Sequence, residues 1–335
     1  MSRPIPAGMD NLVGPLLRSV SRSFYLSVRF LPSELRDPVG LAYLLARATD
    51  TIADTSQIAS GIRKPKLETL SAVIQGRGGL HDIDELRNSF APLQTNADER
   101  RLIESLPECL RALEECEASD LADIRDLLSK ITRAQLLDVE RFGATQEIQA
   151  LVTEAELNEY TYLIAGCVGE FWTRICDRHM RHFAELPVAE MLDLGRRYGA
   201  GLQLINILRD AGGDLRAGRC YLPNDELGSV GLTPNQILES PAKFMILFRK
   251  WIDRAEEGLN AGMKYSLAVR SRRIRAATAL PALIGARTIA LLREAGDAVL
   301  EEKIKVPRSE VRRMVRALGL GLASKRTMER LFRKN

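Results

Sequence analysis

Two pairs of aspartates are the residues of this sequence whose type and spacing suggest chemistry. Asp50 and Asp54 are four residues apart in "RATDTIAD", and Asp210 and Asp214 are four apart in "LRDAGGD". On a helix, residues i and i+4 lie on one face, so the two carboxylates of each pair would project together. The surrounding segments are strongly apolar, which predicts buried helices. Two anions in such a place repel each other and lose hydration, so a bound cation or strong donors must offset them.

Polar and cationic neighbours extend both pairs. Arg47 lies one helical turn before the first pair, Gln203 and Asn206 continue the second acidic stripe, and Arg209 and Arg219 flank it. Carboxylate and amide oxygens suit Mg²⁺, which readily bridges carboxylates to phosphate oxygens, and arginine binds phosphate in a bidentate way. The pattern therefore predicts a magnesium–diphosphate site. The alternative is two surface helices whose aspartates face water. The predicted metal ligands are Asp50, Asp54, Asn206, Asp210 and Asp214.

Helical periodicity dominates the chain, and no convincing set of alternating strands is present. Residues 57–97 are more polar and predict a short helix and a mobile connection, and Gly212 and Gly213 are expected to loosen the turn before Asp214. No linker-like stretch divides the chain. We predict one all-α domain over residues 1–335, with a core at about 15–315 and a basic tail at 316–335. The expected helices cover residues 35–54, 98–118, 119–142, 154–179, 187–211, 234–263, 268–296 and 308–319.

Composition narrows the class of protein. With 45% hydrophobic and 27% charged residues, the 335-residue chain can bury a sizeable core, and its net charge of +4 gives no argument for nucleic acid. The five cysteines lack metal-type spacing, which favours reduced thiols in the cytoplasm, and the three histidines are expected at the surface without ligand-type partners. No run approaches the ~20 apolar residues of a membrane span. Basic runs near the C-terminus suit anionic lipid or diphosphate, or are simply a solvated helix face.

Four segments resemble the squalene and phytoene synthase family over most of the chain, from about residue 15 to about residue 315. "SVSRSF" at 19–24 looks like the family's phosphate-contacting segment, and "RATDTIAD" at 47–54 looks like its first aspartate-rich motif. "EYTYLIAGCVGE" at 159–170 is similar to its central helix. "GAGLQLINILRDAGGDLRAGRCYLPNDEL" at 199–227 is close to its second signature, which is long and specific.

The resemblance implies an isoprenoid synthase fold, a helical bundle around a central apolar cavity, that joins two allylic prenyl diphosphates head to head. The aspartate pairs would bind the Mg²⁺ that draws diphosphate away, and the Tyr160 hydroxyl would face the reaction site. The implied substrate contacts are Ser21, Arg22, Ser23, Arg47, Gln203, Asn206, Arg209, Arg219 and Tyr221.

The sequence indicates the exact product less clearly than it indicates the family. "EEKIKVPR" at 301–308 resembles a segment near the reductant in squalene synthases, which would make Lys303, Lys305 and Arg308 NADPH contacts. Leu163 departs from a tyrosine that many members carry, and "GRCYLPNDEL" reads as phytoene-type whereas "RATDTIAD" reads as squalene-type. We expect a squalene synthase that uses farnesyl diphosphate and NADPH.

Alternatives remain open within and outside the family. A phytoene or dehydrosqualene synthase would need no reductant. From another class, a non-catalytic helical protein would dock on membranes or nucleic acid through its basic C-terminal third. We expect no nucleic-acid partner and a cytoplasmic location, at most with peripheral contact to the inner face of a membrane. The sequence leaves open whether the chain is a monomer or a homodimer.

Overall fold

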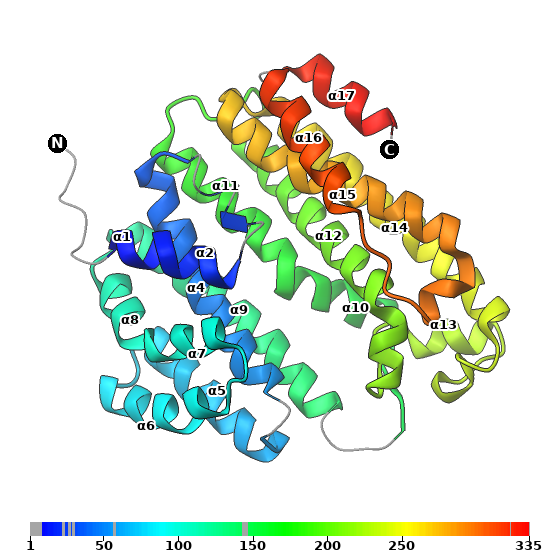
Figure 1. Ribbon diagram of the computed structural model, residues 1–335, viewed down its shortest axis with the longest axis horizontal. Coiled ribbons are helices and arrows are strands. Elements are labelled where there is room, and N and C mark those ends of the chain that lie inside the picture. Colours follow the sequence, from blue (N-terminus) through cyan, green and yellow to red (C-terminus); the bar gives the residue numbers. More distant parts are fainter. Residues whose placement is uncertain are drawn as a thin grey trace. The chain divides into compact units, whose positions relative to one another are not determined.

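The computed structural model describes residues 9–21, 24–25, 28, 31–55, 58–142, 147–321 and 323–334, and these are almost entirely helical (Figure 1). This confirms the all-α prediction. The chain forms two compact units: the first comprises Met1–Ala144 and Arg174–His179, and the second comprises Thr145–Thr173 and Met180–Asn335. One predicted acidic motif belongs to each unit. The prediction of one domain stays a prediction.

The first unit is built around α4 (Ser33–Asp54). Leu41, Leu44, Leu45 and Ile52 of this helix are completely buried, and α4 packs against α5, α8 and α9. The apolar side chains recur at helical spacing, so the helix that carries the first aspartate pair is fixed by its own core contacts. The other elements of this unit are α1 (Met9–Asn11), a π-helical turn (Leu12–Leu16), α2 (Leu17–Val20), α5 (Ser60–Ile74), α6 (Leu80–Phe90), a 3₁₀ turn (Ala91–Leu93), α7 (Ala97–Glu104), α8 (Leu106–Glu114) and α9 (Ala118–Phe142).

Two predictions about this unit were wrong. The polar region 57–97 holds two helices, α5 and α6, rather than one short helix and a connection, because buried leucines and isoleucines occur along both. The single helix expected over 98–118 is divided at Ser105 into α7 and α8. Pro107 lacks a backbone N–H and is tolerated in the first turn of a new helix, which explains the division.

His179 was expected at the surface without a ligand-type partner, and the structure places it partly buried against a carboxylate. Its Nε2 lies 2.9 Å from Oδ2 of the buried Asp120, which also accepts a hydrogen bond of 2.6 Å from Arg178. Asp120 and His179 are 59 residues apart in the chain, so no local pattern could pair them. The bonds tie the last turn of α11 to α9 within the first unit.

The second unit is centred on the long helix α12 (Val188–Arg216), which packs against α14 and α15 (Figure 1). Its other elements are β1 (Gln149–Ala150), α10 (Glu154–Thr161), a π-helical turn (Tyr162–Gly166), α11 (Cys167–His179), β2 (Arg219–Cys220), α13 (Asn224–Ser229), a 3₁₀ turn (Pro234–Gln236), α14 (Pro241–Ala268), α15 (Arg272–Ala295), a 3₁₀ turn (Gly296–Leu300), α16 (Arg308–Leu320) and α17 (Lys325–Lys334). The last six residues of α11 belong to the first unit.

Glycines let α12 approach its neighbours closely. A Cβ atom on Gly169 would lie 1.9 Å from the carbonyl oxygen of Gly195, and one on Gly201 would lie 2.7 Å from Cα of Gly258 on α14. No side chain fits at such distances, so these glycines bring helix backbones into contact. Gly169, in the segment "AGCVG", therefore serves helix packing.

Two features of the second unit differ from the expectations of no strands and of no run long enough to span a membrane. β1 and β2 pair in parallel over two residues each, with Gln149 opposite Arg219 and Ala150 opposite Cys220. In addition, Arg272–Leu300 is long and apolar enough to span a membrane by length and composition, although half of its apolar window is buried in the protein. A core helix of a globular unit has the same character, and α15 packs against α12 and α14.

Candidate active site

The first aspartate pair lies at the end of α4, where the helix reaches solvent. The Asp50 side chain is 41% exposed and Asp54 is exposed, in contrast to the buried leucines earlier in the helix. Nη1 of Arg47 lies 2.5 Å from Oδ2 of Asp50, and its Nη2 lies 2.5 Å from Oε1 of Glu99 on α7. Arg47 thus pairs with the motif, and its predicted contact with substrate phosphate stays a prediction. Glu99 was missed, because it is 52 residues from Arg47 in the chain and local spacing does not pair such distant residues.

Electrostatics at this pair favour a cation. Burial first, and then the negative charge of Asp54, raise the pKa of Asp50 to about 6, although Arg47 opposes the shift. Arg47 is shared between Asp50 and Glu99, so its charge does not serve Asp50 alone. A divalent cation would relieve both the repulsion and the lost hydration.

The N-terminal segment reaches the same region of the first unit. Burial raises the pKa of Tyr43, which is one turn before Arg47, and a hydrogen bond with the Ser21 side chain opposes that shift. The ring of Phe24 stacks on Tyr43 with centroids 4.3 Å apart. Ser21 is thereby close to the face of α4 that carries Arg47. Arg22 and Ser23, the other two predicted phosphate contacts of this segment, lie outside the described residues.

The second aspartate pair lies near the end of α12. The helix continues through Gly212 and Gly213 to Arg216, so the expected loosening before Asp214 does not occur. A Cβ on Gly212 would lie 2.2 Å from the carbonyl oxygen of Leu300, which shows that this glycine serves close packing. Asp210 and Asp214 are consequently on one regular helical face. Upstream on the same stripe, Nδ2 of Asn206 donates to Oε1 of Gln203 at 3.3 Å.

Three cations surround the second pair. Arg209 donates to both oxygens of Asp210 at 2.7 and 3.2 Å, Lys303 lies 2.6 Å from Oδ1 of Asp210, and Arg219 lies 2.7 Å from Oδ1 of Asp214. Gly218 turns the chain with a φ of 77°, a conformation that favours glycine, and this brings Arg219 back toward α12. Arg209 and Arg219 therefore lie beside the pair, and their predicted role as substrate contacts stays a prediction.

The two carboxylates of α12 differ in electrostatic setting. Burial raises the pKa of Asp210, but the hydrogen bonds from Arg209 and Lys303 outweigh it, so the net shift is downward. Burial also raises the pKa of Asp214, and there Arg219 does not fully offset it. A cleft of about 380 Å³ in the second unit exposes both aspartates, and its lining includes Arg209, Arg216, Arg219 and Lys303. This cleft presents oxygen ligands and phosphate-binding cations together.

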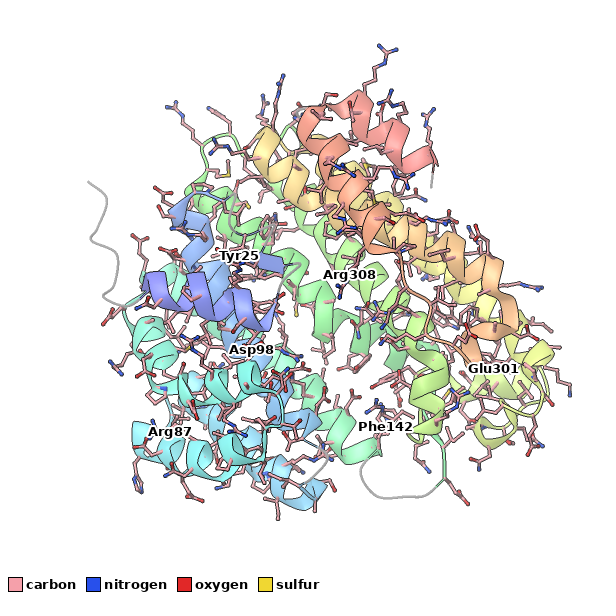
Figure 2. All side chains as sticks on the ribbon, viewed as in Figure 1. Tyr25, Arg87, Asp98, Phe142, Glu301 and Arg308 are labelled. Carbon is pink, nitrogen blue, oxygen red and sulfur yellow. The ribbon has the colours of Figure 1, made fainter. Side chains whose placement is uncertain are left out.

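Only one of the three predicted reductant residues lines the cleft around Asp210 and Asp214. Lys303 lines the Asp210 cleft, whereas Lys305 and Arg308 do not belong to its lining. Both are exposed, and Arg308 is the first residue of α16 (Figure 2). Lys303 therefore belongs, by its contacts, with the carboxylates rather than with a separate nucleotide site.

Two tyrosines predicted for the reaction site lie together. The rings of Tyr160 on α10 and Tyr221 after β2 stack with centroids 4.9 Å apart, and Tyr160 is 8% exposed. Tyr162 has a different role, since its hydroxyl donates to Glu170 at 3.2 Å.

The carboxylates of the two motifs can be compared with the ligands that Mg²⁺ usually takes in proteins. Within the described part of the chain, no three or more His, Cys, Asp or Glu side chains cluster into a complete metal cage. Each unit instead offers one carboxylate pair at its surface. Magnesium keeps several waters and is commonly held by one or two carboxylates together with substrate phosphates. The two aspartate pairs fit that mode of binding. The raised pKa of Asp50 agrees with it, because a bound cation would stabilise the charged carboxylate.

Comparisons with known proteins agree with these motifs. The model of the squalene/phytoene synthase family matches residues 17–310. The bifunctional lycopene cyclase/phytoene synthase of Phaeosphaeria nodorum is 29% identical over 236 residues, which is 70% of this chain and 37% of that protein. The presqualene diphosphate synthase of Rhodopseudomonas palustris is 27% identical over 215 residues, 64% of this chain and 63% of that protein. The chain thus spans less than two fifths of the bifunctional relative.

Solved structures show the same fold. TcSQS in complex with the ligand BPH1237 has a TM-score of 0.77 and 19% identity, over 97% of this chain and 89% of that chain. Squalene synthase HpnC from Alicyclobacillus acidocaldarius has a TM-score of 0.56 and 21% identity, over 86% of this chain and 94% of that chain. These likenesses confirm the all-α isoprenoid synthase fold.

Proposed function

Because this chain belongs to the squalene/phytoene synthase family, we propose that it is a prenyltransferase that joins two prenyl diphosphates head to head. The observation that carries the proposal is the pairing of arginine with aspartate at both motifs. Arg47 contacts Asp50, and Arg209 and Arg219 contact Asp210 and Asp214. Arginines held beside carboxylates are placed to bind a diphosphate that arrives with its metal ions.

The residues would share the work of the first step. Asp50, Asp54, Asn206, Asp210 and Asp214 would hold Mg²⁺, which supplies positive charge for the leaving diphosphate when it is bound. Arg47, Arg209 and Arg219 would donate to the phosphate oxygens as the C–O bond breaks and its electron pair leaves with diphosphate. The stacked rings of Tyr160 and Tyr221 would present aromatic faces and a hydroxyl to the allylic cation.

The second prenyl diphosphate then supplies its double bond. Its π electrons would attack the allylic cation, and loss of one proton closes a cyclopropane ring, which gives a cyclopropylcarbinyl diphosphate. We propose farnesyl diphosphate as the substrate, which makes this product presqualene diphosphate. Loss of the second diphosphate would leave a cyclopropylcarbinyl cation, whose rearrangement and ring opening, with addition of a hydride from NADPH, would give squalene.

A product made without a reductant is the second candidate. One of the three proposed NADPH contacts, Lys303, is paired with Asp210 at 2.6 Å and would have to leave it to reach a nucleotide. The relatives also include a phytoene synthase and a presqualene diphosphate synthase by name. Phytoene, dehydrosqualene and presqualene diphosphate are therefore the products to test beside squalene.

One experiment separates these products. The purified protein is incubated with Mg²⁺ and either farnesyl or geranylgeranyl diphosphate, with and without NADPH, and the lipids are identified by mass spectrometry. If squalene forms only when NADPH is present, the squalene synthase proposal is supported. If C30 or C40 products form without NADPH, the candidate that needs no reductant is supported. Asp210→Asn is the matched inactive control. If neither substrate is consumed and no pyrophosphate is released, the prenyltransferase proposal is wrong.

A further inference from the structure

Positive charge is concentrated at the C-terminal end of this chain. Residues 308–335 contain nine Lys or Arg and two Asp or Glu, a net charge of +7, whereas the whole chain has +4. The preceding 307 residues therefore carry a net charge of −3. The chain is only weakly basic as a whole, but it has one strongly basic segment, formed by α16 and α17.

On α16 the charge forms an ordered stripe. Arg308, Arg312 and Arg316 recur every four residues, so they lie on one face of the helix, and all three are exposed. The same spacing continues to Leu320, whose side chain is 87% exposed. We call Arg308, Arg312, Arg316 and Leu320 the arginine stripe. Figure 2 labels Arg308 at the start of α16 and shows nitrogen-tipped side chains projecting from α16 and α17.

The arginine stripe has no acidic partner among the residues that the structure describes. Like charges at i,i+4 destabilise a helix by a few tenths of a kcal/mol per pair. Glu310 does not neutralise them, because Oε2 of Glu310 accepts from Nε of Arg287 on α15 at 2.8 Å. The charge of α16 therefore remains available to an external anion.

The opposite side of α16 is fixed to the second unit. Met314 and Leu318 are buried, and α16 packs against α15 and α17. The turn after α16 is held by the buried Arg275, which donates to the carbonyl oxygens of Ala323, Val269 and Arg270 at 3.3, 2.8 and 3.2 Å. A helix anchored on one face presents its other face in a defined orientation.

We propose that the arginine stripe docks this protein on the anionic surface of a phospholipid bilayer. Arginines would contact lipid phosphates, and the exposed Leu320 and Val315 would enter the headgroup region, as in interfacial amphipathic helices. Nucleic acid is the less suitable partner, because an exposed leucine in line with the arginines gains nothing from a phosphate backbone. The half-buried α15 packs within the unit and takes no part in this docking.

Vesicle binding tests the proposal without any prenyl substrate, so its outcome is independent of the proposed activity. The full chain is sedimented with vesicles of phosphatidylcholine alone or mixed with phosphatidylglycerol. We expect binding only to the mixed vesicles, and weaker binding at high salt. The double variant Arg312→Glu/Arg316→Glu should bind at least about 25-fold more weakly, since each basic residue near an anionic surface contributes about fivefold.

Matched variants keep the test specific. Lys243→Glu/Arg249→Glu changes the net charge equally through two exposed residues of α14 and should bind as the wild type does. Arg312→Lys/Arg316→Lys should also retain binding, which guards against a folding defect in the glutamate variant. Leu320→Asp should weaken the binding that survives high salt. Equal binding to neutral vesicles, equal loss in the α14 variant, or stripe-dependent binding of duplex DNA instead of vesicles would overturn the proposal.

Discussion

At the scale of single residues, aspartates of similar sequence context have different electrostatic settings. The pKa of Asp50 is raised to about 6 by burial and by Asp54, whereas the net shift of Asp210 is downward because Arg209 and Lys303 outweigh its burial. The charged form of Asp50 is thus disfavoured by its surroundings, whereas that of Asp210 is favoured. A cation should therefore have its larger effect on the first motif.

Replacing Asp50 with Asn should abolish turnover and stabilise the metal-free protein at pH 7. The substitution removes a repelled carboxylate, and because the side chain is 41% exposed we expect only on the order of 1 kcal/mol. Thermal unfolding in EDTA and a pyrophosphate-release assay measure the two effects. Near-normal activity in this variant would show that Asp50 is not a metal ligand.

The same raised pKa predicts a pH dependence. The folded protein binds a proton at Asp50 more tightly than the unfolded chain does, because the pKa is about 6 against an ordinary value of 3.8. Its contribution to metal-free stability is therefore present at low pH and is lost as the pH rises from about 4 through about 6. Comparing thermal unfolding of wild type and Asp50→Asn at several pH values isolates this contribution. A pH-independent difference would contradict it.

Lys303 allows a sharper test of the second motif. Its pairing with Asp210 predicts that Lys303→Met raises the KM for the diphosphate substrate by about tenfold or more, as expected for loss of a charge-assisted contact. Lys305→Met is the matched control, since Lys305 does not line the cleft. The half-reaction should be followed without NADPH. If both variants change only the response to NADPH, Lys303 is a reductant contact instead.

At the scale of elements, helix packing decides how the motifs are held. α12 keeps Asp210 and Asp214 on one face because its glycines allow backbones to approach, including Gly201 against Gly258. An isolated helix would be weakened by so many glycines, since each costs up to about 1 kcal/mol relative to alanine. Tertiary contacts therefore outweigh local propensity along this helix.

Two alanine substitutions on α12 should have opposite effects. Gly201→Ala places a Cβ 2.7 Å from Cα of Gly258 and should destabilise the protein by about 1–3 kcal/mol. Gly213→Ala meets no atom within 4 Å and should stabilise the helix by several tenths of a kcal/mol. Thermal or denaturant unfolding measures both. Similar effects at the two positions would contradict the close packing of α12 on α14.

At the scale of the whole molecule, binding of the proposed metal and diphosphate to the aspartate motifs should raise the stability of the folded protein. A ligand that binds only the folded state raises its stability in proportion to the logarithm of ligand concentration. We therefore expect Mg²⁺ with inorganic pyrophosphate to raise the melting temperature more than either does alone. The rise should be lost in Asp50→Asn and reduced in Asp210→Asn. An equal response of both variants and the wild type would exclude these aspartates from the binding site.

The sequence by itself determined the fold class, most helices and the aspartate–arginine neighbours within each motif. These depend on side chains a few residues apart, which helical geometry brings together whatever the rest of the chain does. The tertiary structure decided the contacts between distant segments: Glu99 with Arg47, Asp120 with His179, and Lys303 with Asp210. It also decided that α12 stays helical through Gly212, because the close contact with Leu300 needs a residue without a side chain. Local periodicity contains no information about such contacts, since they arise only when separate helices pack.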